Sequence, residues 1–160
     1  MADTYSLINN ATLTSTQTDV DFTNISQLYT DLVLFTNSYT SSNGTIQLRF
    51  NGDTGANYYY GYMAGASSSD DNTVANNQTK IQLNTNNTAI NSVWVANIIN
   101  IFSYTATDRF KQLLAMKSMP AERGSIVGTW ANSASAITSI KILGTFEAGS
   151  IFTLYGIKAA

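Results

Sequence analysis

The segment Ile46-Gln47-Leu48-Arg49-Phe50 alternates apolar and polar side chains without a break, and Asn51-Gly52-Asp53-Thr54-Gly55 follows it directly. A period of two is the pattern of a β-strand with one buried face, and Asn, Gly and Asp favour tight turns. Upstream, Asp31-Leu32-Val33-Leu34-Phe35 is continuously apolar after its first residue, which is typical of a strand covered on both faces. These segments predict a protein built from strands.

Similar runs, separated by residues that form turns, recur along the whole chain. We expect further strands at Tyr5–Ile8, Val20–Ile25, Tyr58–Met63, Ile81–Leu83, Val93–Tyr104, Ile126–Trp130, Ile137–Leu143 and Ile151–Ile157. Many short strands at this spacing are typical of a sandwich or a barrel. The sequence therefore predicts an all-β protein, an antiparallel jelly-roll-like β-sandwich of about eight to ten strands, with residues 1–160 forming a single domain.

Three segments do not follow this pattern. Arg109–Lys117 contains good helix formers at helical spacing, so both helix and strand are open; we favour a strand because predicted strands lie on either side. The polar stretches Ala64–Gln78 and Asn84–Asn91 lack any apolar pattern and are predicted to be long loops.

The composition is unusually poor in charge. Charged residues make up 11% of the chain, against about 25% in a typical globular domain, and the net charge is −2. A surface so poor in charge suits burial between subunits, so we expect self-association, as a homotrimer. The eight Lys and Arg residues are scattered, and their densest group is Arg109, Lys111, Lys117 and Arg123. We interpret that group as a solvated edge and expect no nucleic-acid partner.

The chain has few residues suited to catalysis or metal binding. It contains no Cys and no His, which removes the commonest nucleophile–base pairs and metal ligands. The close carboxylate pairs are Asp19 with Asp21 and Asp70 with Asp71, and we interpret both as solvated. The turn Asn51–Gly55 faintly resembles a calcium loop, but Tyr62 stands where the bidentate Glu should be. We therefore expect no catalytic residue, no metal and no cofactor; a carbohydrate-active hydrolase is a minor alternative.

The beginning of the chain and its apolar runs bear on location. Met1–Ser6 lacks the basic start and apolar run of a secretory signal. No apolar stretch approaches the roughly 18 residues of a membrane span. We expect a protein made in the cytoplasm that does not enter a membrane.

Four of the five residues at positions 58–62, in a predicted strand, are tyrosines. Tyr58, Tyr60 and Tyr62 share one face of that strand, and Tyr59 lies on the other. If the three lie on an outer face, they are candidate contacts for sugar rings or for a partner protein. In the alternative, which we favour, one row belongs to the core and the other lies at a subunit contact.

Several segments occur in an order that resembles one group of proteins. They are Tyr5–Ile8, Asp21–Ile25, Tyr29–Leu34, Phe50–Asp53, Trp130 followed by Ala136–Ile140, and Gly149–Ile157. In this order they resemble the short virion structural proteins of tailed phages that infect cyanobacteria and other aquatic bacteria. The resemblance implies a jelly-roll module, often trimeric, without catalytic residues.

The same resemblance implies a function and a location. It points to a protein of the virion, a capsid decoration (cement) protein that binds the outer shell and stabilises it. The implied partners are further copies of the chain and the major capsid protein or other virion proteins. The alternative is a tail-fibre or receptor-binding module that recognises host surface glycan.

Overall fold

The computed structural model describes residues 4–40, 45–66, 70–84, 93–120 and 122–158. These residues contain twelve strands and no helix. The strands are β1 (Tyr5–Thr12), β2 (Gln17–Phe22), β3 (Asp31–Thr40), β4 (Gln47–Phe50), β5 (Tyr58–Ala66), β6 (Asp70–Gln78), β7 (Ile81–Gln82), β8 (Val93–Phe102), β9 (Lys111–Met119), β10 (Glu122–Trp130), β11 (Ile140–Phe146) and β12 (Ile151–Ile157). The all-β prediction is confirmed.

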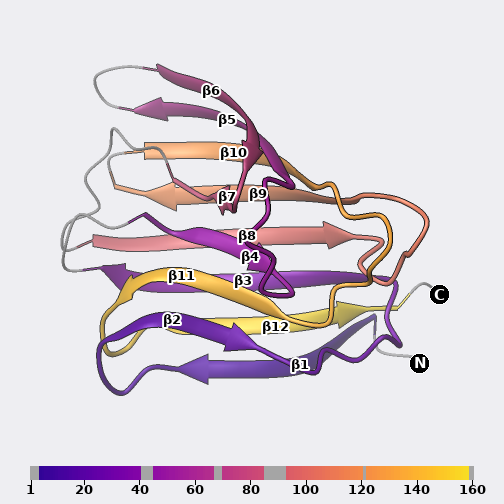
Figure 1. The fold of residues 1–160 in the computed structure, drawn as a ribbon. Helices are drawn as coiled ribbons and strands as arrows, with labels where there is room; N and C mark the ends of the chain where they lie inside the picture. Colours follow the sequence, from indigo (N-terminus) through magenta and orange to yellow (C-terminus); the bar gives the residue numbers. More distant parts are fainter. Residues whose placement is uncertain (1–3, 41–44, 67–69, 85–92, 121, 159–160) are drawn as a thin grey trace.

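The strands form two antiparallel sheets that pack face to face (Figure 1). The larger sheet has eight strands in the order β1-β12-β3-β8-β9-β10-β5-β6, and the smaller has four in the order β2-β11-β4-β7. Four pairs nest within one another along the chain: β1 with β12, β2 with β11, β3 with β8, and β4 with β7. Nested pairs divided between two sheets are the jelly-roll topology, which confirms the predicted architecture.

Two hairpins are added to this jelly roll. β5 and β6 lie between β4 and β7 in the chain, and β9 and β10 lie between β8 and β11. Both hairpins join the larger sheet beyond β8 and double its width from four strands to eight. The described residues therefore hold twelve strands, more than the eight to ten expected from the sequence.

One predicted loop is wrong. Within Ala64–Gln78, residues 70–78 form the edge strand β6, which pairs with β5. An edge strand is held by backbone hydrogen bonds to its neighbour and need not bury an apolar face. Val74, a large apolar residue of β6, is 79% exposed. Of the second predicted loop, Asn84–Asn91, all but Asn84 lies outside the described residues.

The ambiguous segment Arg109–Lys117 is a strand over its final seven residues, which belong to β9. Burial alternates strictly along β9, with Lys111, Leu113, Ala115 and Lys117 on the buried side. The helical alternative is therefore wrong, and the preference for a strand is confirmed.

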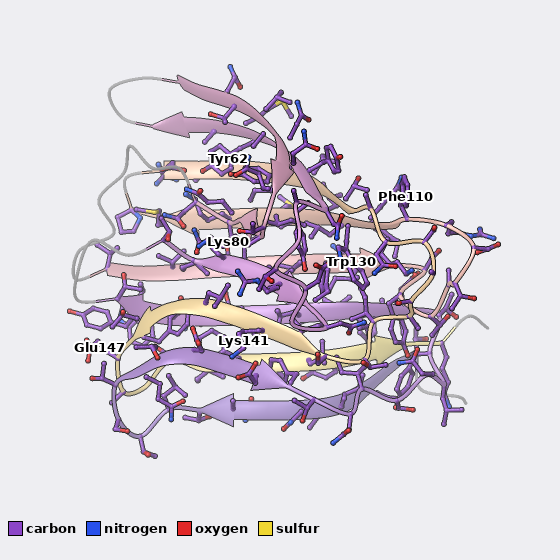
Figure 2. The ribbon with its side chains drawn as sticks, viewed as in Figure 1. Tyr62, Lys80, Phe110, Trp130, Lys141 and Glu147 are labelled. Carbon is purple, nitrogen blue, oxygen red and sulfur yellow. The ribbon has the colours of Figure 1, made fainter. Side chains whose placement is uncertain are left out.

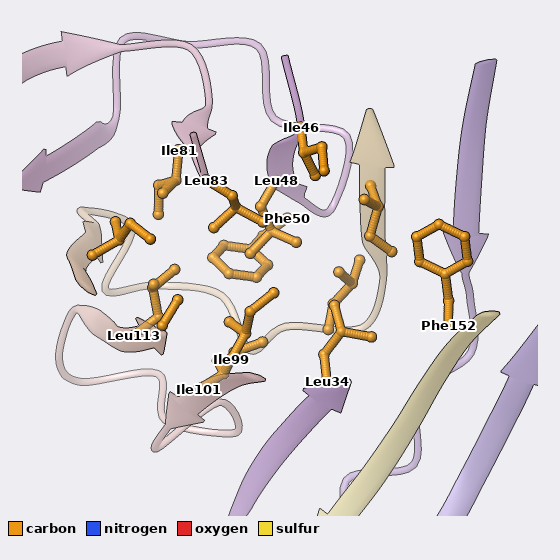
Figure 3. Packing of buried hydrophobic residues seen from close by; sticks show 14 of the residues in the cluster. Leu34, Ile46, Leu48, Phe50, Ile81, Leu83, Ile99, Ile101, Leu113 and Phe152 are labelled. Atoms are coloured by element: carbon orange, nitrogen blue, oxygen red, sulfur yellow. The ribbon is translucent and has the colours of Figure 1, made fainter. Parts of the chain in front are cut away.

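The core lies between the two sheets and joins them into one cluster. Leu34, Ile99 and Leu113 from the larger sheet meet Leu48 and Phe50 from the smaller (Figure 3). The alternating segment 46–50 buries its three apolar side chains, as its pattern predicts.

Candidate functional site

The row of tyrosines predicted as candidate contacts points inward. Tyr58 and Tyr62 are buried in the core and Tyr60 is half-buried against it. The ring of Tyr58 stacks on Trp130, with 6.5 Å between ring centroids and an angle of 22° between the planes. These three side chains therefore do not form an exposed platform for sugar or protein, which corrects that interpretation; the core alternative holds for this row.

The candidate calcium turn serves the same aromatic cluster. The Asp53 carboxylate accepts hydrogen bonds from Trp130 Nε1 at 2.7 Å, Asn57 Nδ2 at 2.9 Å and the backbone N–H of Gly55 at 2.8 Å. Burial raises the pKa of Asp53, but these hydrogen bonds to the charged form outweigh it and hold the pKa below its ordinary value. In the part of the chain that the structure describes, no group of three acidic residues could hold a metal.

The hydroxyl of Tyr58 ties the same turn to the core. It accepts a hydrogen bond from the backbone N–H of Phe50 at 3.0 Å and lies 3.2 Å from the carbonyl oxygen of Asp53. Burial raises the pKa of Tyr58 to about 12, so the hydroxyl keeps its proton and remains a donor. These contacts indicate a structural role for the turn Asn51–Gly55.

Two of the lysines predicted to lie on a solvated edge are buried instead. The Nζ of Lys111 donates to the carbonyl oxygen of Asn132 at 2.8 Å and lies 5.4 Å from the ring centroid of Trp130. Burial lowers the pKa of Lys111. Lys117 forms an ion pair with Glu122, and both side chains are at most 1% exposed. The edge interpretation is wrong for these two residues because β9 turns them toward the core; Arg123 is exposed as expected.

Apolar side chains instead gather on the outer face of the larger sheet. Because opposite residues in paired strands share a face, one row crosses all eight strands. The row is Leu7, Tyr155, Val33, Asn100, Leu114, Val127, Gly61 and Val74. The next row along the strands includes Phe35, Ile98, Met116 and Met63. Met116 is 64% exposed and Ile98 is 45% exposed.

The two outer faces of the sandwich differ in charge. On the smaller sheet, the Nζ of Lys141 lies 3.0 Å from Asp21 and 3.6 Å from Asp19, and Lys141 is visible on this side in Figure 2. On the larger sheet, among outward positions of β1, β12, β3, β8, β9, β10 and β5, only Asp31 and Arg123 are charged. They lie at the first and second residues of their strands, away from the centre of the face.

Shallow hollows lie toward the β1 side of this face. Tyr5, Phe35, Thr153 and Tyr155 line a hollow of about 510 Å³. The ring of Tyr155 stands edge-on to those of Tyr5 and Phe35, with centroid distances of 6.4 and 5.8 Å. A second hollow of about 430 Å³ shares Phe35 and Thr153 and extends to Ile98. The arrangement offers aromatic rings and uncharged hydroxyl groups without a charged group among the lining residues.

Sequence reasoning missed this face as a site. A signal was present, because Leu114 and Met116 alternate with Leu113 and Ala115, so that apolar residues occupy both sides of one strand. A strand that faces water on one side carries polar residues there. The outer face of the larger sheet, defined by the two rows above, is the candidate functional site.

Comparisons with known proteins do not assign this site. No family model matches the chain, and the searches of curated proteins and of solved structures found no match. Among the described residues there is no helix long and apolar enough to cross a membrane. A function for this chain is therefore inferred from its fold, the distribution of its charged residues and the composition of its surface.

Proposed function

We propose that this chain is a structural protein of a phage virion, a capsid decoration (cement) protein that binds the outer shell and stabilises it. The observation that carries the proposal is the apolar, charge-poor outer face of the larger sheet. Soluble monomers rarely expose a broad contiguous apolar surface, and such a surface marks contact with another protein. The resemblance of the sequence to phage virion proteins suggests that the assembly is a virion.

The distribution of charge supports protein partners over nucleic acid. Lys111 and Lys117 are buried, which removes two of the eight cations from the surface. Lys141 is engaged with Asp19 and Asp21. Too few free cations remain on one face to displace counterions from phosphates. The proposed partners are further copies of this chain and the major capsid protein.

The buried ionisable groups support a structural role over a catalytic one. Lys111, Lys117 and Glu122 are buried, and their charged groups are bonded to other groups of the chain, Lys111 to the carbonyl oxygen of Asn132 and Lys117 to Glu122. A rigid sandwich that contributes contact area can bridge neighbouring shell subunits, and several weak contacts of an oligomer add through avidity. The stabilisation of the shell would then come from the contact area between subunits and not from a catalysed reaction.

The hollow lined by Tyr5, Phe35 and Tyr155 favours a second candidate function. Exposed aromatic rings with adjacent hydroxyl groups can stack on and hydrogen-bond to a sugar ring. A tail-fibre or receptor-binding module that recognises host glycan would use this hollow, in place of the inward-facing row at Tyr58, Tyr60 and Tyr62.

The copy number in purified virions tests the proposal. Quantitative mass spectrometry should find the chain in a fixed ratio to the major capsid protein, with many copies per particle. Absence from the particle, or a few copies that co-purify with isolated tails, would overturn the decoration role.

Binding of the purified chain to host cells tests the second candidate. Phe35→Ala removes a ring from the hollow, and Phe110→Ala is its matched control, because Phe110 is an exposed ring outside the two rows. Loss of cell binding in the first variant alone would favour the glycan module. Equal binding by both variants would count against it.

A further inference from the structure

We infer that the outer face of the larger sheet is covered by the same face of a second copy, in a dimer related by a two-fold axis. This inference rests on the proposed assembly role and names the partner at that face. It makes this face the contact between copies, so the shell would be bound by surfaces that the dimer leaves exposed.

The first support is that β9 carries apolar residues on both sides. Its buried side includes Leu113 and Ala115, and its outer side includes Leu114 and Met116. Strands covered on both sides have apolar residues on both faces. β8 has the same character, with Ile98 outside and Ile99 inside. The two central strands, β8 and β9, therefore have the apolar pattern of strands that are covered on both faces.

The second support is area. Eight strands at about 4.8 Å spacing span about 34 Å, and a strand of nine residues is about 30 Å long, so the face measures about 1,000 Å². A stable interface of standard size needs about 800 Å² from each partner. One face of one copy therefore supplies enough surface for a stable dimer.

The third support is the arrangement of charge. The centre of the face lies between β8 and β9, where Ile98 pairs with Met116. Asp31 and Arg123 are toward the margins, at the starts of β3 and β10. Across the seven strands other than β6, one negative and one positive side chain point outward, so this part of the face meets a copy of itself without strong like-charge repulsion. An apolar centre with a polar rim is the usual anatomy of an interface.

The geometry favours two copies over the expected trimer. A two-fold contact is isologous, so the same patch is buried on both subunits. Around a three-fold axis, each subunit must offer two different patches, so one continuous face would be only partly covered. The dimer also covers the hollow at Tyr5, Phe35 and Tyr155, so it excludes glycan binding there.

Sedimentation equilibrium of the purified full chain at micromolar concentration tests the inference. We expect a dimer, twice the 17.3 kDa of one chain. Ile98→Lys and Met116→Lys each place a charge at the centre, and each should raise the dimer Kd at least about 100-fold because the ammonium group loses water without gaining a partner. Leu28→Lys is the matched control, because Leu28 is 79% exposed outside the larger sheet; its Kd should be unchanged.

A monomer or a trimer of the unmodified chain would overturn the inference, as would a folded Met116→Lys variant that still dimerises with normal affinity.

A second measurement does not depend on variants that carry charge. The chain has no Cys, so Met116→Cys introduces a single thiol close to the expected axis. Mild oxidation should cross-link this variant into a covalent dimer, whereas Leu28→Cys should stay uncrosslinked; equal cross-linking of the two would overturn the proposed face.

The outcome is separable from that of the proposed function. Copy number in the virion is measured on particles, and dimerisation is measured on the isolated chain. A shell-bound monomer would refute the dimer and leave the decoration role standing, whereas a dimer absent from shells would do the reverse.

Discussion

Replacing Lys117 by methionine should destabilise the protein severely. The Lys117–Glu122 pair lies within the sandwich, with side chains at most 1% exposed, and the Lys117 Nζ is also 5.2 Å from the ring centroid of Tyr62. Methionine keeps most of the volume of the aliphatic stem, so the main loss is the positive charge beside a buried carboxylate. Breaking a buried pair in this way costs about 3–5 kcal/mol, a large part of the 5–15 kcal/mol that holds a typical domain folded.

The double variant Lys117→Met, Glu122→Leu separates the cost of a lone charge from the net value of the pair. It removes both charges, so we expect a free energy of unfolding within about 1 kcal/mol of the unmodified protein, or above it. Urea denaturation followed by the fluorescence of Trp94 and Trp130 measures all three chains. Arg109→Met is the control, because the Arg109 side chain is 65% exposed outside the strands and its replacement should leave the free energy of unfolding almost unchanged. A single variant that costs less than about 1 kcal/mol, or a double variant that costs as much as both singles together, would refute the reasoning.

Two further changes test local features of the fold. The pKa of Asp53 is lowered, so its hydrogen bonds contribute stability above the pKa of the unfolded chain, about 3.9, and that stability is lost as pH falls through the lower folded pKa. Thermal melts between about pH 6 and pH 2 should therefore show a smaller loss of Tm for Asp53→Asn than for the unmodified protein; parallel curves would contradict this. Gly156→Ala would place a Cβ 2.2 Å from the ring of Tyr29, so it should cost about 1–3 kcal/mol in urea unfolding, whereas Gly61→Ala meets nothing within 4 Å and should cost far less.

Much of the fold can be predicted from the sequence because one-sided burial leaves a period of two. The segment 46–50 shows it clearly, and its apolar residues lie in the core. β6 escapes prediction because it is a polar edge strand held by backbone pairing with β5, which leaves no hydrophobic pattern. The nested pairing that defines the jelly roll depends on contacts between distant strands, and no local pattern encodes which strands meet.

The candidate site is harder to predict, because periodicity shows which residues share a face but not which face is inner. Tyr58, Tyr60 and Tyr62 do share one, as predicted, while Tyr59 and Met63 occupy the other. Both faces of β5 carry large side chains, so neither is marked as the solvent side. The choice is made by tertiary contacts, chiefly those of the Tyr58 hydroxyl with Phe50 and of its ring with Trp130.

The ambiguity of Arg109–Lys117 and the apolar outer face have one physical cause. A strand with water on one side would alternate clearly, but β9 places Leu114 and Met116 outside, opposite Leu113 and Ala115. Apolar residues on both sides remove the period of two and leave spacings that also suit a helix. β9 and β10 belong to the hairpin that widens the larger sheet beyond β8, and without the two added hairpins the face would have half as many strands. The additions to the jelly roll thus create the surface that we propose for assembly, and the apolar residues on both sides of β9 are what a strand covered on both sides requires.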